Sequence, residues 1–179
     1  MANIVLTGFM CTGKSEVGRR LAKRLGRPFV DTDHLIEQRA GKTVAAIFRD
    51  DGEPAFRAFE RDAVATASAG EDTVIAVGGG AILDPANVGR LRARGVIVCL
   101  SADPDTILRR VGDVARRPLL AGGDPRGTVE RLLAERGPAY ARAADVTVDT
   151  SDRKVGEVVE RVHEEIGRLE RTNRWKSST

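Results

Sequence analysis

The feature that most constrains this chain is a short apolar run followed at once by a glycine-rich loop and an amphipathic helix. Residues 4–6 are too few for a helix and are typical of a buried parallel strand. Residues 8–15, GFMCTGKS, fit the pattern G-x-x-x-x-G-K-[ST], and Val17, Leu21 and Leu25 then recur at helical spacing. This order suits a phosphate-binding loop, because loop amides and the positive end of the helix surround phosphates. The segment therefore predicts an α/β fold that binds a nucleotide.

The remainder of the chain repeats the alternation of strand and helix. Similar apolar runs lie at residues 73–77, 96–100 and, more weakly, 146–148. Three Asp-Pro pairs predict helix starts, at residues 84–85, 103–104 and 124–125. In each pair the Asp can cap free amides, and Pro loses nothing at the first helical position. We expect a parallel sheet with helices on both faces.

Two stretches depart from this alternation. Residues 33–69 form a helical pattern with a break near Asp51 and Gly52, which predicts an excursion of helices between the second and third strands. Residues 112–127 are rich in Gly, Arg, Asp and Pro and lack apolar periodicity, as in a mobile lid or a plain surface loop. We expect one domain over residues 1–167 and a polar, basic, frayed tail over 168–179.

Charge and cysteine content narrow the classes of partner. The 29 basic and 26 acidic residues are mixed along the chain, which predicts a solvated surface and no nucleic-acid partner. The sequence has no leading apolar signal and no run of about 18 apolar residues, so no membrane partner is expected. The two cysteines, Cys11 and Cys99, indicate a reduced, cytoplasmic setting.

The loop at residues 8–15 supplies the candidates for nucleotide binding. Lys14 is expected to reach the β- and γ-phosphates of ATP, and the Ser15 hydroxyl to bind Mg²⁺. Cys11 is either a reactive thiol near Lys14 or a small side chain tolerated in the loop, and Cys99 is expected in the core. The candidates at this loop are Gly8, Cys11, Thr12, Gly13, Lys14, Ser15 and Val17.

Two polar or glycine-rich segments follow the second and third predicted strands, at the edge where open parallel sheets bind ligands. Asp31 and Asp33 could serve different partners, one the Mg²⁺ shell and the other a substrate hydroxyl, or either could cap the next helix. Gly78, Gly79 and Gly80 either let a ligand approach the backbone amides or form a tight turn.

Three arginines have distinguishing settings, although each could be a solvated surface residue. Arg57 lies in the helical excursion with Glu60 three positions on to hold its guanidinium. Arg117 precedes a Pro-Leu-Leu segment in the candidate lid. Arg136 falls near the predicted end of a helix, just before Gly137 and Pro138.

Taken together, these residues resemble the shikimate kinase family, whose members transfer the γ-phosphoryl group of ATP to the 3-hydroxyl of shikimate. The resemblance spans nearly the whole chain. It rests on the loop 8–15, the triplet 31–33, the run 47–57, the glycines 78–80, residues 117–120, and Arg136 with Pro138 and Tyr140. It implies a three-layer P-loop kinase fold with a five-stranded parallel sheet, a lid and a helical substrate-binding insertion, acting as a monomer.

The resemblance also implies roles for the acceptor-side residues. Asp33 would be the base that meets the substrate hydroxyl, and Arg57 and Arg136 would grip the shikimate carboxylate. The amides of Gly79 and Gly80 would hold the ring hydroxyls, and Arg117 would neutralise the phosphoryl group in flight. These roles agree with a reaction that depends mainly on positioning and charge stabilisation.

On the nucleotide side, the resemblance assigns Mg²⁺ to Ser15 and Asp31. Adenine would lie between Arg153 and either Arg109 or Arg110. The family usually has Gly where this chain has Cys11. A gluconate kinase, a nucleoside monophosphate kinase and a catalytically silent nucleotide-binding module are the competing hypotheses.

Overall fold

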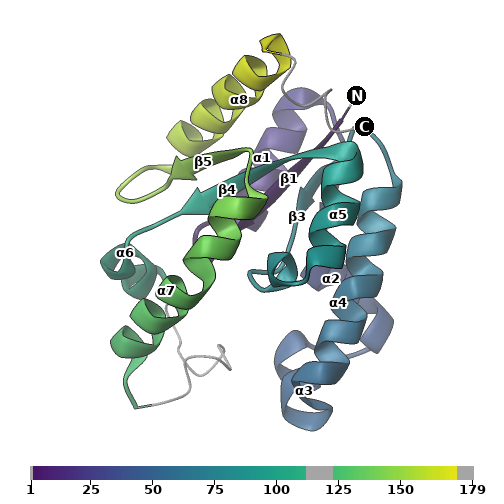
Figure 1. Ribbon diagram of the computed structural model, residues 1–179, viewed down its shortest axis with the longest axis vertical. Coiled ribbons are helices and arrows are strands. Elements are labelled where there is room, and N and C mark those ends of the chain that lie inside the picture. The colour runs from purple at the N-terminus through teal and green to yellow at the C-terminus, as the bar shows by residue number, and fades with distance from the viewer. Residues whose placement is uncertain (1, 112–122, 173–179) are drawn as a thin grey trace.

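The computed structural model describes residues 2–111 and 123–172 (Figure 1). Within these residues, five strands form one parallel sheet in the order β2-β3-β1-β4-β5. Their bounds are β1 (Asn3–Gly8), β2 (Phe29–Asp31), β3 (Val74–Ala76), β4 (Gly95–Ser101) and β5 (Val146–Asp149). Strand β1 is central and buried throughout, as its apolar run predicted. The predicted five-stranded parallel sheet is confirmed.

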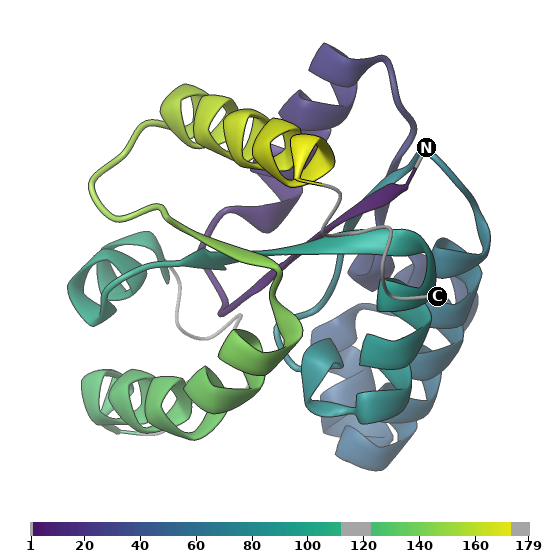
Figure 2. The same cartoon turned by 45° about the horizontal axis from the view of Figure 1, so that its top comes forward.

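Helices cover both faces of the sheet. One face carries α1 (Lys14–Leu25) and α8 (Val155–Arg171), and the other carries α4 (Gly52–Ala69) and α5 (Pro85–Arg94). Figure 2 shows the sheet between these two layers. Side chains alternate along β1, so Ile4 and Leu6 join the core under α1 and α8, while Val5 joins the core under α4 and α5. The three-layer architecture is therefore set by strands that are apolar on both faces.

A further apolar cluster joins the loop after β1 to α6 (Pro104–Val111) and α7 (Pro125–Ala143). Phe9 of the loop, Ile107 of α6 and Val129 of α7 are each buried in it. The cluster fixes α7 beside the phosphate-binding loop. This placement brings the second half of α7 to the ligand-binding edge of the sheet.

The predicted excursion between the second and third strands is confirmed as helical. It consists of α2 (Thr32–Ala40), α3 (Val44–Asp50) and the long helix α4. The break near Asp51 and Gly52 is present, with Gly52 in the left-handed region at φ +82°, and a second break lies at Gly41. Ile36, Ile47 and Phe56 give this part of the chain a small core of its own.

Each Asp-Pro pair begins a helix, as predicted. The Asp84, Asp103 and Asp124 carboxylates accept backbone amide hydrogen bonds of 2.9, 2.7 and 2.9 Å from the first turns of α5, α6 and α7. The short 3-10 helix η1 (Ala81–Leu83) separates the triple glycine from α5. Capping by a short acidic side chain therefore sets the starts of these helices.

The structure corrects two expectations about α7. It begins at Pro125, so the last residues of the predicted loop 112–127 are helical, whereas 112–122, including Arg117, lie outside the described residues. It also continues through Pro138 to Ala143, so Arg136 lies well inside the helix. Proline removes one helical hydrogen bond, but the buried Tyr140 and Ala143 attach the following turn to the core.

The C-terminal prediction also needs correction. Helix α8 runs to Arg171, so the first residues of the expected tail 168–179 are helical, and 173–179 lie outside the described residues. One side of α8 is buried against the sheet through Val158, Val162 and Ile166. This packing stabilises the helix beyond the predicted boundary at residue 167. No helix in the described part of the chain has the length and apolar content needed to cross a membrane.

Candidate active site

The loop between β1 and α1 has the conformation that binds phosphates, and its glycines are sterically required. Gly8 has φ +134°, and a Cβ there would lie 2.1 Å from the carbonyl oxygen of Leu100 in β4. Gly13 has φ +91° and precedes the first residue of α1. The Thr12 hydroxyl donates to the Phe9 carbonyl at 2.9 Å and braces the loop from within. The free amides at the start of α1 therefore face the space above the sheet.

Lys14 lies along this loop. Its Nζ donates to the carbonyl oxygens of Gly8 and Phe9, both at 2.9 Å. Burial lowers the pKa of Lys14, and the nearby carboxylates of Asp33 and Asp31 oppose that shift. The ammonium group is thus held between the loop and the acidic residues after β2, where phosphate oxygens can replace the carbonyls as its partners.

Ser15 and Asp31 form an oxygen pair suited to a hard cation. The Ser15 hydroxyl donates to Oδ2 of Asp31 at 2.5 Å, and Oδ1 of Asp31 accepts the Asp33 amide at 3.0 Å. Asp31 is therefore the helix cap of α2, one of the alternatives for this pair of carboxylates, while its other oxygen faces the phosphate loop. A hydroxyl and a carboxylate oxygen are ligands that Mg²⁺ accepts, with phosphates and water completing its shell.

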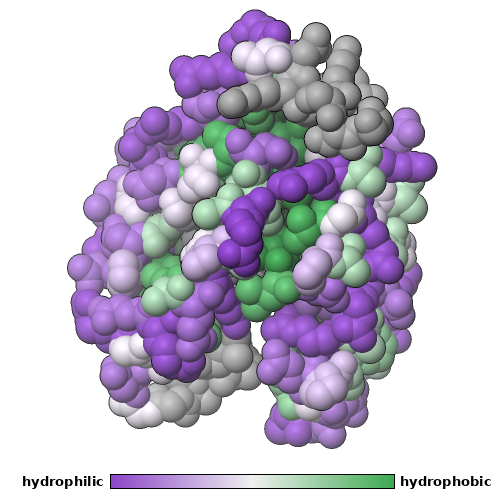
Figure 3. All heavy atoms as spheres, viewed as in Figure 1, coloured by the Kyte–Doolittle hydropathy of each residue, from purple (hydrophilic) through white to green (hydrophobic). Residues whose placement is uncertain are grey.

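A cavity of about 390 Å³ opens beside Lys14 and Ser15, between the phosphate loop, α4 and α7. In Figure 3 the surface is hollowed between the α7 side and the α3–α4 side of the molecule. The acceptor-side candidates that lie within the described residues line this cavity, namely Asp33, Arg57, Gly78, Gly79, Gly80 and Arg136. Residues from four separate segments thus meet in one place.

Arg57 is held in this cavity by two carboxylates. Its Nη1 donates to Glu60 at 2.7 Å, as the spacing predicted, and its Nη2 donates to Glu53 at 2.9 Å. Glu60 is only 2% exposed. Burial raises the pKa of Glu60, and the Arg57 guanidinium opposes that shift. The guanidinium is consequently fixed in orientation before any ligand arrives.

Arg136 approaches from the opposite wall. It is 8% exposed, and its guanidinium carbon lies 5.9 Å from the centre of the Phe9 ring. One turn further along α7, the Tyr140 hydroxyl donates to the Gly79 carbonyl at 2.6 Å. Two cationic groups on different helices therefore face one small cavity, which suits a carboxylate.

The triple glycine passes directly beneath these charged groups. A Cβ at Gly80 would lie 2.4 Å from Nη1 of Arg57, which its two carboxylate partners hold in place. The amide of Gly78 donates to the Thr32 hydroxyl at 3.2 Å. The chain turns into η1 here, which agrees with one of the two alternatives for this segment, and the glycines also line the cavity, as the other alternative requires.

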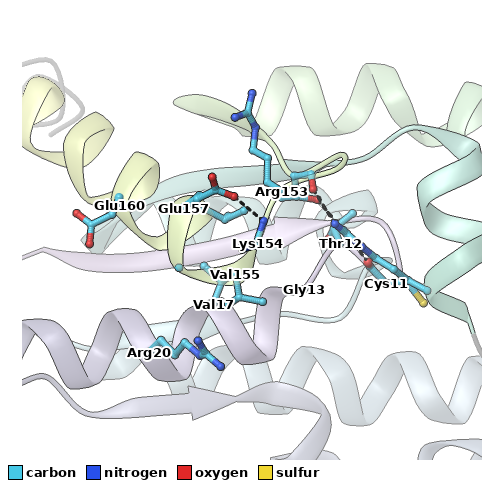
Figure 4. Close-up of a pocket in the computed structure, with 14 residues that line it drawn as sticks. Cys11, Thr12, Gly13, Val17, Arg20, Arg153, Lys154, Val155, Glu157 and Glu160 are labelled. Atoms are coloured by element: carbon cyan, nitrogen blue, oxygen red, sulfur yellow. Dashed lines mark hydrogen bonds between the residues drawn. The ribbon is translucent and has the colours of Figure 1, made fainter.

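A second cavity of about 870 Å³ lies on the other side of the phosphate loop, against the start of α8 (Figure 4). It is lined by the nucleotide-side candidates Cys11, Thr12, Gly13, Val17, Arg110 and Arg153. In Figure 4 the loop residues lie beside the segment that leads into α8, where the Lys154 amide donates to Glu157 at 2.7 Å. The phosphate loop thus separates a larger cavity from a smaller one.

The structure distinguishes the two adjacent arginines of α6. Arg110 lines the larger cavity and donates to the hydroxyl and carbonyl oxygens of Thr150, at 2.9 and 2.6 Å. Arg109 turns away to Asp152, at 2.6 Å, and is absent from the described lining of this cavity. Of the two sequence alternatives, Arg110 is the one that lines the larger cavity.

Cys11 lines both cavities and is one of the described non-glycine residues with positive φ, at +61°. A side chain in the left-handed region carries strain that glycine does not. Cys99 is 4% exposed in the core, as predicted, and burial raises the pKa of its thiol to about 11. Cys99 is therefore unreactive near neutral pH.

Three residues that position the site were not among the sequence candidates for it. Thr32 holds the amide of Gly78, Thr150 anchors Arg110, and Tyr140 holds the carbonyl of Gly79. Thr32 could have been suspected from its place between two candidate carboxylates. The other two are distant in sequence from the groups they hold, so no local pattern marks them.

The fold and the paired cavities define a phosphotransferase of the P-loop class. Residues 10–167 match the family model described as shikimate kinase. The chain belongs to the shikimate kinase family. It is 50% identical to the shikimate kinase of Caldanaerobacter subterraneus over 90% of this chain and 94% of the relative, and 49% identical to that of Symbiobacterium thermophilum over 92% and 95%.

Solved structures agree with this assignment. A shikimate kinase from Acinetobacter baumannii in complex with shikimate superposes with a TM-score of 0.89 at 36% identity, over 93% of each chain. A gluconokinase from Sinorhizobium meliloti gives a TM-score of 0.55 at 17% identity, over 98% of this chain and 97% of the other. The second likeness shows a shared fold alone.

Proposed function

We propose that this chain transfers the γ-phosphoryl group of ATP to the 3-hydroxyl of shikimate, giving shikimate 3-phosphate and ADP with Mg²⁺ as cofactor. The observation that carries the proposal is the smaller cavity, where Asp33, Arg57 and Arg136 face Lys14 and Ser15 of the phosphate loop. An acceptor bound among the first three lies next to the transferable phosphate. Membership of the shikimate kinase family supports the identity of that acceptor.

The two arginines orient the acceptor by its carboxylate. Arg57 is preset by Glu60 and Glu53, and Arg136 enters from α7, so a planar carboxylate meets guanidinium groups from two sides. The backbone amides of Gly79 and Gly80 serve the ring hydroxyls, because the Gly78 amide donates to Thr32. Contacts of the arginines and the glycine amides with the non-reacting part of the acceptor orient its reacting hydroxyl toward the phosphate loop.

Asp33 is the proposed base for that hydroxyl. It lies in the first turn of α2, lines the smaller cavity and interacts electrostatically with Lys14. Proton removal by a positioned carboxylate increases the nucleophilic character of the acceptor oxygen during transfer. The cap of α2 is supplied by Asp31, so the Asp33 side chain is not required for capping.

The phosphate loop binds and stabilises the transferred group. Lys14 exchanges the carbonyls of Gly8 and Phe9 for β- and γ-phosphate oxygens, and the loop amides surround the same oxygens. Ser15 and Asp31 would hold Mg²⁺, the latter through water. When bound, the cation neutralises charge on the phosphates. Arg117, proposed from the sequence to neutralise the phosphoryl group in flight, lies outside the described residues.

The larger cavity is the proposed site of the adenosine part of ATP. Arg110 and Arg153 would frame the base, and Cys11, Thr12, Gly13 and Val17 line the wall nearest the phosphates. Within the described residues, side chains of one chain line both cavities, which supports a monomer as the active unit. Cys11 and Cys99 are free thiols, which fits a reducing cytoplasm.

A coupled ADP-release assay with Mg-ATP tests this function. The acceptor panel contains shikimate, gluconate and nucleoside monophosphates, and the expected result is ADP release with shikimate alone. Turnover of another acceptor would identify a different small-molecule kinase. ATP binding without turnover of any acceptor would favour the catalytically silent module.

A further inference from the structure

The backbone of the triple-glycine segment is held at almost every polar group. The Gly78 amide donates to Thr32, the Gly78 carbonyl accepts from Ala81 at 3.0 Å, and the Gly79 carbonyl accepts from Tyr140 at 2.6 Å. The Ala81 carbonyl accepts from the side chain of Asn87 at 3.0 Å. Within the described residues, only the amides of Gly79 and Gly80 donate no hydrogen bond in this segment. These two amides are left for a ligand.

Peptide geometry links each of these amides to a carbonyl that is held. In a trans peptide the C=O of one residue and the N–H of the next point in opposite directions. The Gly79 amide shares its peptide plane with the Gly78 carbonyl, which is bound within the turn. The Gly80 amide shares its plane with the Gly79 carbonyl, which is bound by Tyr140. Tyr140 therefore determines where the Gly80 amide points.

The two glycines do not by themselves fix the orientation of the Gly79–Gly80 peptide plane. A plane between two glycines can rotate into conformations that other residues avoid, so its orientation must come from outside the segment. Tyr140 is suited to hold it, because this residue is 7% exposed and belongs to the same buried apolar cluster as Phe9 and Val129. Burial raises the pKa of Tyr140 to about 12, so the hydroxyl remains a donor at physiological pH.

Tyr140 also connects two walls of the smaller cavity, which we call the acceptor cavity because the acceptor is proposed to bind there. It lies four residues after Arg136 on α7, so both side chains occupy one face of the helix. Arg136 lines the cavity directly, and Tyr140 contacts its glycine wall from behind. A shift of α7 would therefore move the carboxylate-binding arginine and the Gly80 amide together.

We propose that Tyr140 is a positioning residue for the acceptor: its hydroxyl fixes the Gly79–Gly80 peptide so that the Gly80 amide faces a ring hydroxyl of shikimate. This inference rests on the proposed function. It assigns to a buried phenol, which touches no reacting atom, a part in recognising the acceptor.

The test is Tyr140→Phe, which removes one oxygen atom and keeps the ring. We expect the KM for shikimate to rise about 5- to 10-fold, from the loss of one oriented hydrogen bond, with a smaller change in kcat and the KM for ATP within about 2-fold. The penalty should disappear for a 4-deoxy or a 5-deoxy analogue of shikimate. A purely structural role would not depend on one hydroxyl of the substrate.

Val129→Ala is the matched control, since it opens space in the same apolar cluster on the same helix. We expect it to lower Tm by about 3 °C or more and to leave both KM values within about 2-fold. A Tyr140→Phe enzyme whose KM values match those of this control would overturn the inference while the proposed function stands. A wild-type enzyme that does not turn over shikimate would instead remove the proposed function.

A second measurement needs no variant. Tyr140 is the only tyrosine in the chain, so labelling tyrosine with ¹³C at Cζ gives one resonance next to the hydroxyl in question. We expect shikimate to shift this resonance and ADP alone to leave it in place. A resonance that stays unmoved at saturating shikimate would contradict the inference even if Tyr140→Phe failed to fold.

Discussion

The two cavities on either side of the phosphate loop are built in different ways. In the smaller cavity, where we propose that the acceptor binds, Arg136 and Glu60 are buried, and Arg57 is fixed by Glu60 and Glu53. In the nucleotide cavity, which is about twice as large, the loop backbone supplies much of one wall and Arg153 is exposed. Arg110 is anchored there to Thr150. The comparison indicates that acceptor specificity depends on preset side chains, whereas nucleotide binding depends mainly on backbone geometry.

The largest expected effect is that of Asp33→Asn. Removing the proposed base should lower kcat by about 100-fold or more while the fold is retained. Steady-state ADP release and far-UV circular dichroism measure the two quantities. Asp62→Asn, at an exposed position of α4, is the control and should have wild-type activity. A nearly normal rate for Asp33→Asn would reduce this carboxylate to a structural residue of α2.

Next is Arg136→Ala, which removes one wall of the acceptor cavity. The KM for shikimate should rise about 10- to 100-fold, because hydrogen bonds to a charged group contribute about 1.5–3 kcal/mol, and ATP binding should change little. Arg131→Ala on the exposed side of the same helix breaks only the surface pair with Glu135 and serves as control. Weakened ATP binding with an unchanged KM for shikimate would contradict the proposal that the two cavities bind different substrates.

A smaller effect is expected on the nucleotide side. Arg110→Ala should raise the KM for ATP about 5- to 10-fold, since a cation beside the base and its anchor to Thr150 are lost together. Arg109→Ala is the neighbouring control and should stay within about 2-fold, because that side chain pairs with Asp152 at the surface. A larger rise in the KM for ATP for Arg109→Ala than for Arg110→Ala would show that the adenine lies elsewhere.

The smallest effect should come from Cys11→Gly at the junction of the cavities. Left-handed backbone costs a non-glycine residue about 1–2 kcal/mol, and the added chain entropy of glycine offsets about 0.5–1 kcal/mol of that gain. We therefore expect the free energy of unfolding to rise by about 0.5–1 kcal/mol, measured by urea denaturation. A drop in stability would mean that contacts of the thiol outweigh the strain at φ +61°.

Much of the fold and many of the residues that line the two cavities could be predicted, because their signals are local. The phosphate loop is marked by spacing and by the strand and helix around it, and Arg57 by Glu60 one turn away. The Asp-Pro pairs mark helix starts through capping, which involves only neighbouring residues.

The sequence prediction was wrong, left alternatives open or was silent where contacts between distant residues determine the structure. The sequence predicts that a helix ends near Arg136, but α7 continues to Ala143 because Tyr140 and Ala143 pack its last turn onto the core. The choice between Arg109 and Arg110 depends on Thr150, which lies about 40 residues away in the loop after β5. The hydrogen bond from Tyr140 to the Gly79 carbonyl joins residues 61 positions apart, so it can be recognised only in the folded structure.

The central claim is that the acceptor cavity presents one particular hydroxyl of shikimate to the γ-phosphate of ATP. Phosphorus NMR of the product, made by the wild-type enzyme from Mg-ATP and shikimate, tests this most directly. We predict a single phosphomonoester resonance coupled to the proton on carbon 3, formed in equal amount with ADP. Phosphate on another hydroxyl, or ADP accompanied only by inorganic phosphate, would contradict the account.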